Sequence, residues 1–158
     1  MSSLIDKIYS PEDLLQRLSS ADRPMVLTNG VFDIVHKGHV TYLEQARQLG
    51  ASLVIALNTD DSVKRLNKGP ERPLNTLLDR ASVLAAMASV SWVTWFDENT
   101  PVELITKLRP DIYVKGGDYD MSKIPETAVV QGYGGRSLAI PFVDGYSTTS
   151  LVRKMRIG

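Results

Sequence analysis

The sequence predicts an α/β fold in which helices cover both faces of a doubly wound, five-stranded parallel sheet. Two observations support this prediction. Short apolar runs alternate along the chain with segments of helical periodicity, which is the pattern of strand–helix–strand units joined by right-handed crossovers. The clearest run, 53–57, is apolar throughout, as expected for a strand that is covered on both faces.

The first half of the chain is expected to contain a helix, a strand and a second helix before the apolar run 53–57. Ser10 suits the N-cap of the first helix, and Pro24 follows its end. The apolar residues 25–28 predict the first strand. Helical spacing begins at about Val40 and stops at Gly50, a residue that commonly ends helices.

The second half begins with a polar and basic segment, 62–74, which contains glycine and two prolines and is expected to be a mobile loop. Trp92 and Trp95 are three residues apart in the next strand, so we expect them to pack on opposite faces. The remaining predicted elements are a helix at 77–88, strands at 90–96, 111–114 and 137–140, and helices at 100–108 and 147–156.

Length and composition restrict the classes of protein. The 158 residues fit one domain, with an N-terminal helical part (1–24), a core (25–146) and a C-terminal helix (147–158). The formal net charge of +0 argues against nucleic-acid binding through bulk charge. The absence of cysteine excludes disulfides and thiolate chemistry. No apolar run is long enough for a membrane span and the first residues do not resemble a signal peptide, so we expect a cytoplasmic protein without membrane contact.

Polar clusters follow the predicted strands at 28–39, 58–61, 115–119 and 145–149. Ligands of open parallel sheets bind beyond the carboxyl ends of the strands. The order of elements along the chain therefore predicts that these clusters form one composite site.

The only two histidines, His36 and His39, occupy one turn between the first strand and the next helix. A helix start offers free N–H groups and a positive dipole end, and Gly38 allows the backbone to approach a ligand closely. Two imidazoles there can donate hydrogen bonds to phosphoryl oxygens. We therefore predict a phosphate site with both histidines as catalytic residues. The alternatives are capping histidines and a zinc site, which lacks a convincing third ligand.

The pattern G-x-F-D-x-x-H-x-G-H at 30–39 resembles the signature of the cytidylyltransferase-like nucleotidyltransferases. Residues 147–149 with Arg153 resemble the second hallmark of that family, at the start of its last helix. Both motifs stand in the family's order, and the resemblance extends over 25–156. It implies a Rossmann-like nucleotidyltransferase fold.

Other stretches resemble one branch of this family, the D-glycero-D-manno-heptose 1-phosphate adenylyltransferases. The resemblance implies transfer of AMP from ATP, with Mg²⁺, to heptose 1-phosphate, giving ADP-heptose and pyrophosphate for the lipopolysaccharide inner core. It also implies a homodimer and a free-standing form of an activity that is elsewhere fused to a kinase. The alternatives are a glycerol-3-phosphate cytidylyltransferase, another sugar or alcohol phosphate nucleotidyltransferase, and a non-catalytic nucleotide sensor. The stretches are 58–60, 64–66, 72–73, 79–80, 110–111 and 114–119.

The other candidate residues are chosen from strand ends, from helix starts and from the segment 62–74, called the basic loop below. Lys64 is expected to close on the triphosphate as a third catalytic residue. Asp60 is expected to orient Lys64 or to bind substrate hydroxyls. Asp33 and Arg72 are also expected to bind substrate, Asp33 through sugar or loop contacts; no metal ligand is predicted. Core packing is the alternative for Phe32, and one hydroxyl at the last helix start is expected to cap that helix. The expected nucleotide-binding residues are Thr28, Asn29, Gly30, Phe32, Gly38, Lys115, Gly116, Gly117, Asp118, Ser147, Thr148 and Thr149.

Overall fold

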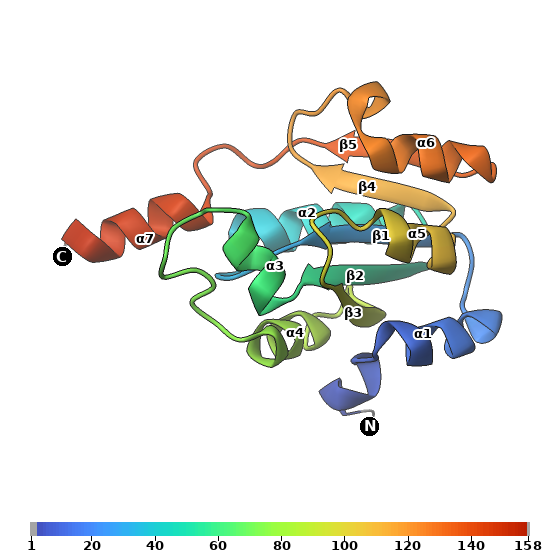
Figure 1. Ribbon diagram of the computed structural model, residues 1–158, viewed down its shortest axis with the longest axis horizontal. Helices are drawn as coiled ribbons and strands as arrows, with labels where there is room; N and C mark the ends of the chain where they lie inside the picture. Colours follow the sequence, from blue (N-terminus) through green and yellow to red (C-terminus); the bar gives the residue numbers. More distant parts are fainter. Residues whose placement is uncertain (1–2, 158) are drawn as a thin grey trace.

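The computed structural model describes residues 3–157 and contains one sheet of five parallel strands, in the order β3-β2-β1-β4-β5 (Figure 1). The doubly wound prediction is thereby confirmed, while the expected domain bounds at 1 and 158 lie outside the described residues. The strand order reverses between β1 and β4, and the crevice at such a reversal is where these sheets bind ligands. The strands are β1 (Met25–Gly30), β2 (Ser52–Asn58), β3 (Trp92–Phe96), β4 (Ile112–Gly116) and β5 (Arg136–Ile140).

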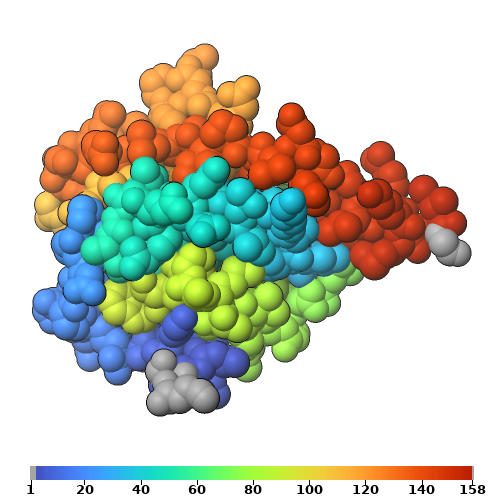
Figure 2. Space-filling model, turned by 180° about the vertical axis from the view of Figure 1, so that it is seen from behind, coloured from blue at the N-terminus to red at the C-terminus, as the bar shows by residue number. Residues whose placement is uncertain are grey.

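Helices pack on both faces of the sheet. One face is covered by α2 (Lys37–Gln48) and α4 (Leu77–Ala85), and the other by α1 (Pro11–Arg17), α5 (Val102–Leu108) and α6 (Pro125–Gly132). The short α3 (Asp60–Arg65) follows β2. The last helix, α7 (Thr148–Ile157), projects from the body of the molecule (Figures 1 and 2). Single-turn 3₁₀ helices lie at Leu4–Lys7, Leu18–Ser20 and Met121–Lys123.

The core has two layers because side chains along each strand alternate between the faces. In β1, Val26 packs in the layer of α2 and α4, and Leu27 packs in the layer of α1, α5 and α6. Trp92 and Trp95 also pack in different layers, which confirms the prediction from their spacing. β2 is buried along its whole length, as its apolar run predicted.

Two boundaries near the predicted site differ from the sequence prediction. α2 begins at Lys37 instead of about Val40, so the histidine turn is the helix start itself. The basic segment 62–74, expected to be a loop, begins inside α3, because the Thr59 side chain accepts a hydrogen bond from the Ser62 backbone N–H and caps a helix.

The helix α6 was not predicted. It has eight residues, and Thr127, Val129 and Val130 within it are β-branched residues, which favour strands. Packing of Val130 into the core overrides that preference.

In the described part of the chain, the helices are too short or too polar to cross a membrane.

Candidate active site

The structure joins the polar clusters at the carboxyl edge of the sheet into one site, as predicted. The Thr148 hydroxyl donates a hydrogen bond to the Ile34 carbonyl over 3.2 Å, which joins the start of α7 to the loop after β1. A Cβ atom added to Gly116 would lie 3.2 Å from the Tyr42 ring, so the end of β4 lies against α2. The cluster after β2 is joined through Arg80, described below.

The histidine pair lies at the start of α2. The rings of His36 and His39 stack with their centroids 3.8 Å apart and an interplanar angle of 24°. The backbone N–H of His36 donates to Nδ1 of His39 over 3.3 Å. Nδ1 is therefore an acceptor, and the neutral ring of His39 carries its proton on Nε2. This tautomer can donate a hydrogen bond to a ligand.

Both histidines favour the neutral state. Burial lowers the pKa of His36, and burial together with the charge of His36 lowers the pKa of His39 to about 4. Nδ1 of His36 is buried without a hydrogen-bond partner among residues 3–157. A buried polar atom of this kind is satisfied when a ligand or water reaches it.

Gly38 separates the two histidines where there is no room for a side chain. An added Cβ atom would lie 2.9 Å from Cε1 of His36 and 3.0 Å from Cβ of Tyr146. The Tyr146 ring lies 6.1 Å from the His36 ring, nearly parallel to it. The segment before α7 therefore packs directly on the histidine turn.

The start of α7 gives its three hydroxyls different roles. The Ser147 hydroxyl accepts a hydrogen bond from the Ser150 backbone N–H over 3.0 Å and caps the helix, which confirms that one of the three would do so. Thr148 contacts the loop after β1, and Thr149 is exposed. The starts of α2 and α7 thus lie close together, and each start favours an anion.

Asp33 and Arg72 form a buried ion pair, with 2.6 Å between Oδ2 and Nε. The backbone N–H groups of Leu74 and Asn75 also donate to the Asp33 carboxylate. Burial by itself would raise the pKa of Asp33, but these two amides and Arg72 together hold it below its usual value. Asp33 therefore fastens the basic loop to the turn after β1, the loop contact foreseen for it. Substrate binding by Asp33 and Arg72 stays a prediction.

Arg80 was overlooked as a site residue. Its side chain is fully buried, and Nη1 donates to the carbonyls of Val31 and Asn58, at the ends of β1 and β2. Nη2 contacts Oδ1 of Asp60 at 2.7 Å. That Asp60 orients Lys64 or binds substrate hydroxyls stays a prediction. A basic residue on the apolar face of α4, between Leu77 and Leu84, was the signal that could have identified it.

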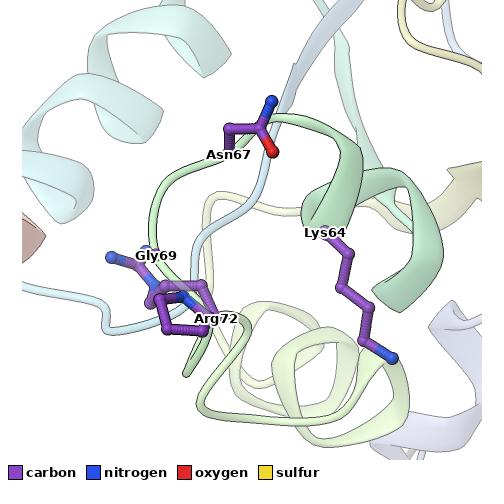
Figure 3. Close-up of a pocket in the computed structure, with 5 residues that line it drawn as sticks. Lys64, Asn67, Gly69 and Arg72 are labelled. Carbon is purple, nitrogen blue, oxygen red and sulfur yellow. The ribbon is translucent and has the colours of Figure 1, made fainter.

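The basic loop lines an open pocket of about 350 Å³ (Figure 3). Lys64 lies 3.7 Å from Asp61, is mostly exposed, and points away from Arg72 in this view. The Arg156 guanidinium lies 2.6 Å from the Glu71 carboxylate, which joins the loop to α7. The lining residues are Lys64, Asn67, Gly69, Pro70 and Arg72. Closure of Lys64 on a triphosphate stays a prediction.

The candidates in β1 are occupied by internal contacts. The Thr28 hydroxyl is buried and pairs with the Tyr42 hydroxyl. Asn29 accepts a hydrogen bond from the Tyr113 hydroxyl over 2.6 Å. A Cβ atom added to Gly30 would lie 2.9 Å from the ring of Phe32, which is itself buried in the core. For Thr28 and Phe32 the structure shows packing roles, and their nucleotide contacts stay predictions.

The glycine pair at the end of β4, Gly116 and Gly117, leaves room for an aromatic ring. A Cβ atom on Gly116 would lie 2.6 Å from the Phe142 ring, and Gly117 has a φ of +125°, which favours glycine. The Lys115 ammonium lies 4.6 Å from the centroid of the Tyr119 ring. Asp118 is exposed beside them.

A metal held by protein ligands alone finds little support here. Among residues 3–157, no three His, Cys, Asp or Glu side chains come together as a metal site. Zinc sites need three or four such ligands, whereas Mg²⁺ usually keeps several waters and binds through substrate phosphates.

The chain has close relatives among known proteins. It is 58% identical to a D-beta-D-heptose 1-phosphate adenylyltransferase of Bordetella bronchiseptica, over 96% of this chain and 95% of that protein. It is 50% identical to the bifunctional protein HldE of Marinomonas sp., over 95% of this chain but only 32% of that longer protein.

Solved structures show the same fold. A lipopolysaccharide core biosynthesis protein from Thermoplasma volcanium is 25% identical and matches with a TM-score of 0.65, over 76% of this chain and 98% of that one. A pantoate-beta-alanine ligase from Francisella tularensis, 10% identical, matches with a TM-score of 0.61, over 95% of this chain and 77% of that one, and supports the fold alone. Residues 27–154 match the family described as cytidylyltransferase-like. The chain belongs to the cytidylyltransferase-like family.

Proposed function

We propose that this protein transfers AMP from ATP to D-glycero-D-manno-heptose 1-phosphate, giving ADP-heptose and pyrophosphate for the lipopolysaccharide inner core. The observation that carries the proposal is the pair of neutral, stacked histidines at the start of α2, beside the start of α7. Two helix starts and two imidazoles suit a ligand with several phosphates. The 58% identity to a heptose 1-phosphate adenylyltransferase supports the choice of acceptor.

The reaction needs no protein nucleophile. A phosphate oxygen of the sugar phosphate attacks the α-phosphorus of ATP, and the bond from that phosphorus to the bridging oxygen breaks as pyrophosphate leaves. Catalysis then consists of holding the two anions in line and stabilising the charge that develops. Nε2–H of His39 donates to a phosphoryl oxygen, and His36 contributes a second donor. Lys64 adds positive charge when the basic loop closes on the phosphates.

Three further assignments belong to this proposal. Mg²⁺ bound by the phosphates of ATP would neutralise part of their charge. The protein acts in the cytoplasm, where ATP is available. It forms a homodimer, which the mass measured by light scattering after gel filtration would test.

The test of the function is a turnover assay with two nucleotides and two acceptors. ATP or CTP is mixed with heptose 1-phosphate or glycerol 3-phosphate, and pyrophosphate release is followed. We expect release with ATP and heptose 1-phosphate and little in the other three mixtures. Release that requires CTP would replace the proposal with a cytidylyltransferase, and release in none would favour a nucleotide sensor.

A further inference from the structure

Glu126 is a buried carboxylate that none of the roles described above uses. It lies in the first turn of α6 and is only 3% exposed. Its Oε2 has no hydrogen-bond partner within residues 3–157. The positive end of the helix dipole compensates only part of the cost of burying such a group. The carboxylate oxygen can therefore accept a hydrogen bond from a ligand or a water.

The position of Glu126 directs it toward the candidate site. Glu126 and Val130 are four residues apart and share one face of α6, and Val130 packs in the same core layer as Tyr113 of β4. Burial raises the pKa of Tyr113, and the negative charge of Glu126 raises it further. α6 follows β4 through a crossover loop, so its first turn lies at the carboxyl edge of the sheet.

Two polar side chains at that edge lie on the same face of the sheet. Asn29 receives the Tyr113 hydroxyl proton on Oδ1, which leaves its NH₂ group as a donor toward a ligand. Lys115 is two residues beyond Tyr113 in β4, on the same face. Both are only partly buried, and both stand beside the strand-order reversal.

An ionised carboxylate accepts hydrogen bonds and donates none. The phosphates of the proposed substrates cannot satisfy it, but their sugar hydroxyls can, on the ribose of ATP or on the sugar phosphate. We propose that Glu126 and Asn29 contribute to a sugar-hydroxyl subsite on the α6 side of the β1–β4 crevice, with Tyr113 holding Asn29 in place. This proposal rests on the proposed function for the identity of the two sugars.

The test compares the wild-type protein with Glu126→Gln, which keeps the size of the side chain and removes its charge. The matched control is Thr127→Val, which alters the next residue of α6, also buried and with an unpartnered hydroxyl. Calorimetry gives the Kd values of ATP and of 2′,3′-dideoxy-ATP, and steady-state kinetics give the KM of heptose 1-phosphate. A lost hydrogen bond to a charged group should weaken binding about tenfold or more.

Two results support the subsite and identify its sugar. If the ribose is bound, E126Q weakens ATP binding at least about tenfold and leaves the binding of 2′,3′-dideoxy-ATP unchanged. If the sugar phosphate is bound, ATP binding is unchanged and the KM of heptose 1-phosphate rises by the same factor. In either case T127V binds like the wild type, and E126Q melts no lower than the wild type, because it removes a buried charge.

Changes of less than about twofold in both affinities, in a folded E126Q protein, would overturn the proposal. Glu126→Ala repeats the comparison if E126Q does not fold, and failure of both variants to fold would assign the carboxylate to stability instead. If the wild type binds ATP but does not use heptose 1-phosphate, the proposed function fails. The ATP arm still tests the subsite in that case.

Discussion

The imidazole rings of His36 and His39 lie 3.8 Å apart, stacked within 24° of parallel. Burial favours the uncharged form of both, and a charge on one ring disfavours a charge on the other. The histidine pair therefore presents hydrogen-bond donors without a permanent positive charge. This arrangement agrees with a chain whose net charge is +0 and whose proposed ligands are polyanions.

His39 should contribute mainly to the rate of the chemical step. His39→Ala removes the Nε2–H donor, and loss of one donor to developing charge typically lowers kcat about 10²–10³-fold. Pyrophosphate release at saturating ATP and heptose 1-phosphate measures the effect. Turnover equal to that of the wild type would remove His39 from the mechanism.

The same residue should make stability depend on pH. The pKa of His39 is about 4 in the folded protein and near 6.5 in the unfolded chain, so the unfolded chain binds more protons between these values. Stability should therefore fall as the pH is lowered from 6.5 toward 4. Urea unfolding of the wild type and of His39→Gln, at several pH values, isolates the contribution. Parallel pH profiles for the two proteins would contradict the assignment.

The buried pair of Asp33 and Arg72 should be important for stability. Asp33→Asn leaves the Arg72 guanidinium buried without its counter-ion, and breaking a buried pair costs about 3–5 kcal/mol. The change in unfolding free energy is measured in urea. Lys123→Ala, which breaks an exposed pair with Asp120, is the control and should cost less than about 1 kcal/mol. Equal losses of unfolding free energy in the two variants would show that the buried Asp33 pair contributes no more stability than an exposed pair.

Gly38 should be required for the geometry of the histidine turn. A Cβ atom in Gly38→Ala would lie 2.9 Å from the His36 ring and displace it. Because small misplacements of catalytic groups can cost about 10²-fold in rate, we expect kcat to fall at least about tenfold. Gly132→Ala, where a Cβ atom meets nothing within 4 Å, is the matched control and should leave kcat unchanged. An unimpaired G38A enzyme would show that the turn adapts without loss.

The architecture could be predicted from the sequence because buried strands appear in it as short runs of apolar residues. The apolar run of β2 and the alternating faces of β3 translate directly into strand positions and layers. α6 escaped prediction because Val129 and Val130 favour strands by local preference and become helical only through packing. The early start of α2 escaped because Lys37 and Gly38 precede the apolar periodicity on which the prediction relied.

The sequence predicted which polar clusters form the candidate site, but not which side chains within them contact one another. The two histidines were identified from their spacing, and their meeting with the α7 start was inferred from strand order. The pairing of Asp60 with Arg80 escaped prediction because it depends on which side chains α4 turns inward. The burial of Glu126 depends in the same way on α6, which the sequence did not reveal.

The central claim, transfer of AMP to a sugar phosphate, is tested most directly by following two radioactive labels. The protein is incubated with heptose 1-phosphate and Mg²⁺, together with ATP labelled with ³²P at either the α- or the γ-phosphorus. The account predicts that the α-label appears in the sugar nucleotide and the γ-label in pyrophosphate. A γ-label in the sugar product, or an α-label in free AMP alone, would contradict it.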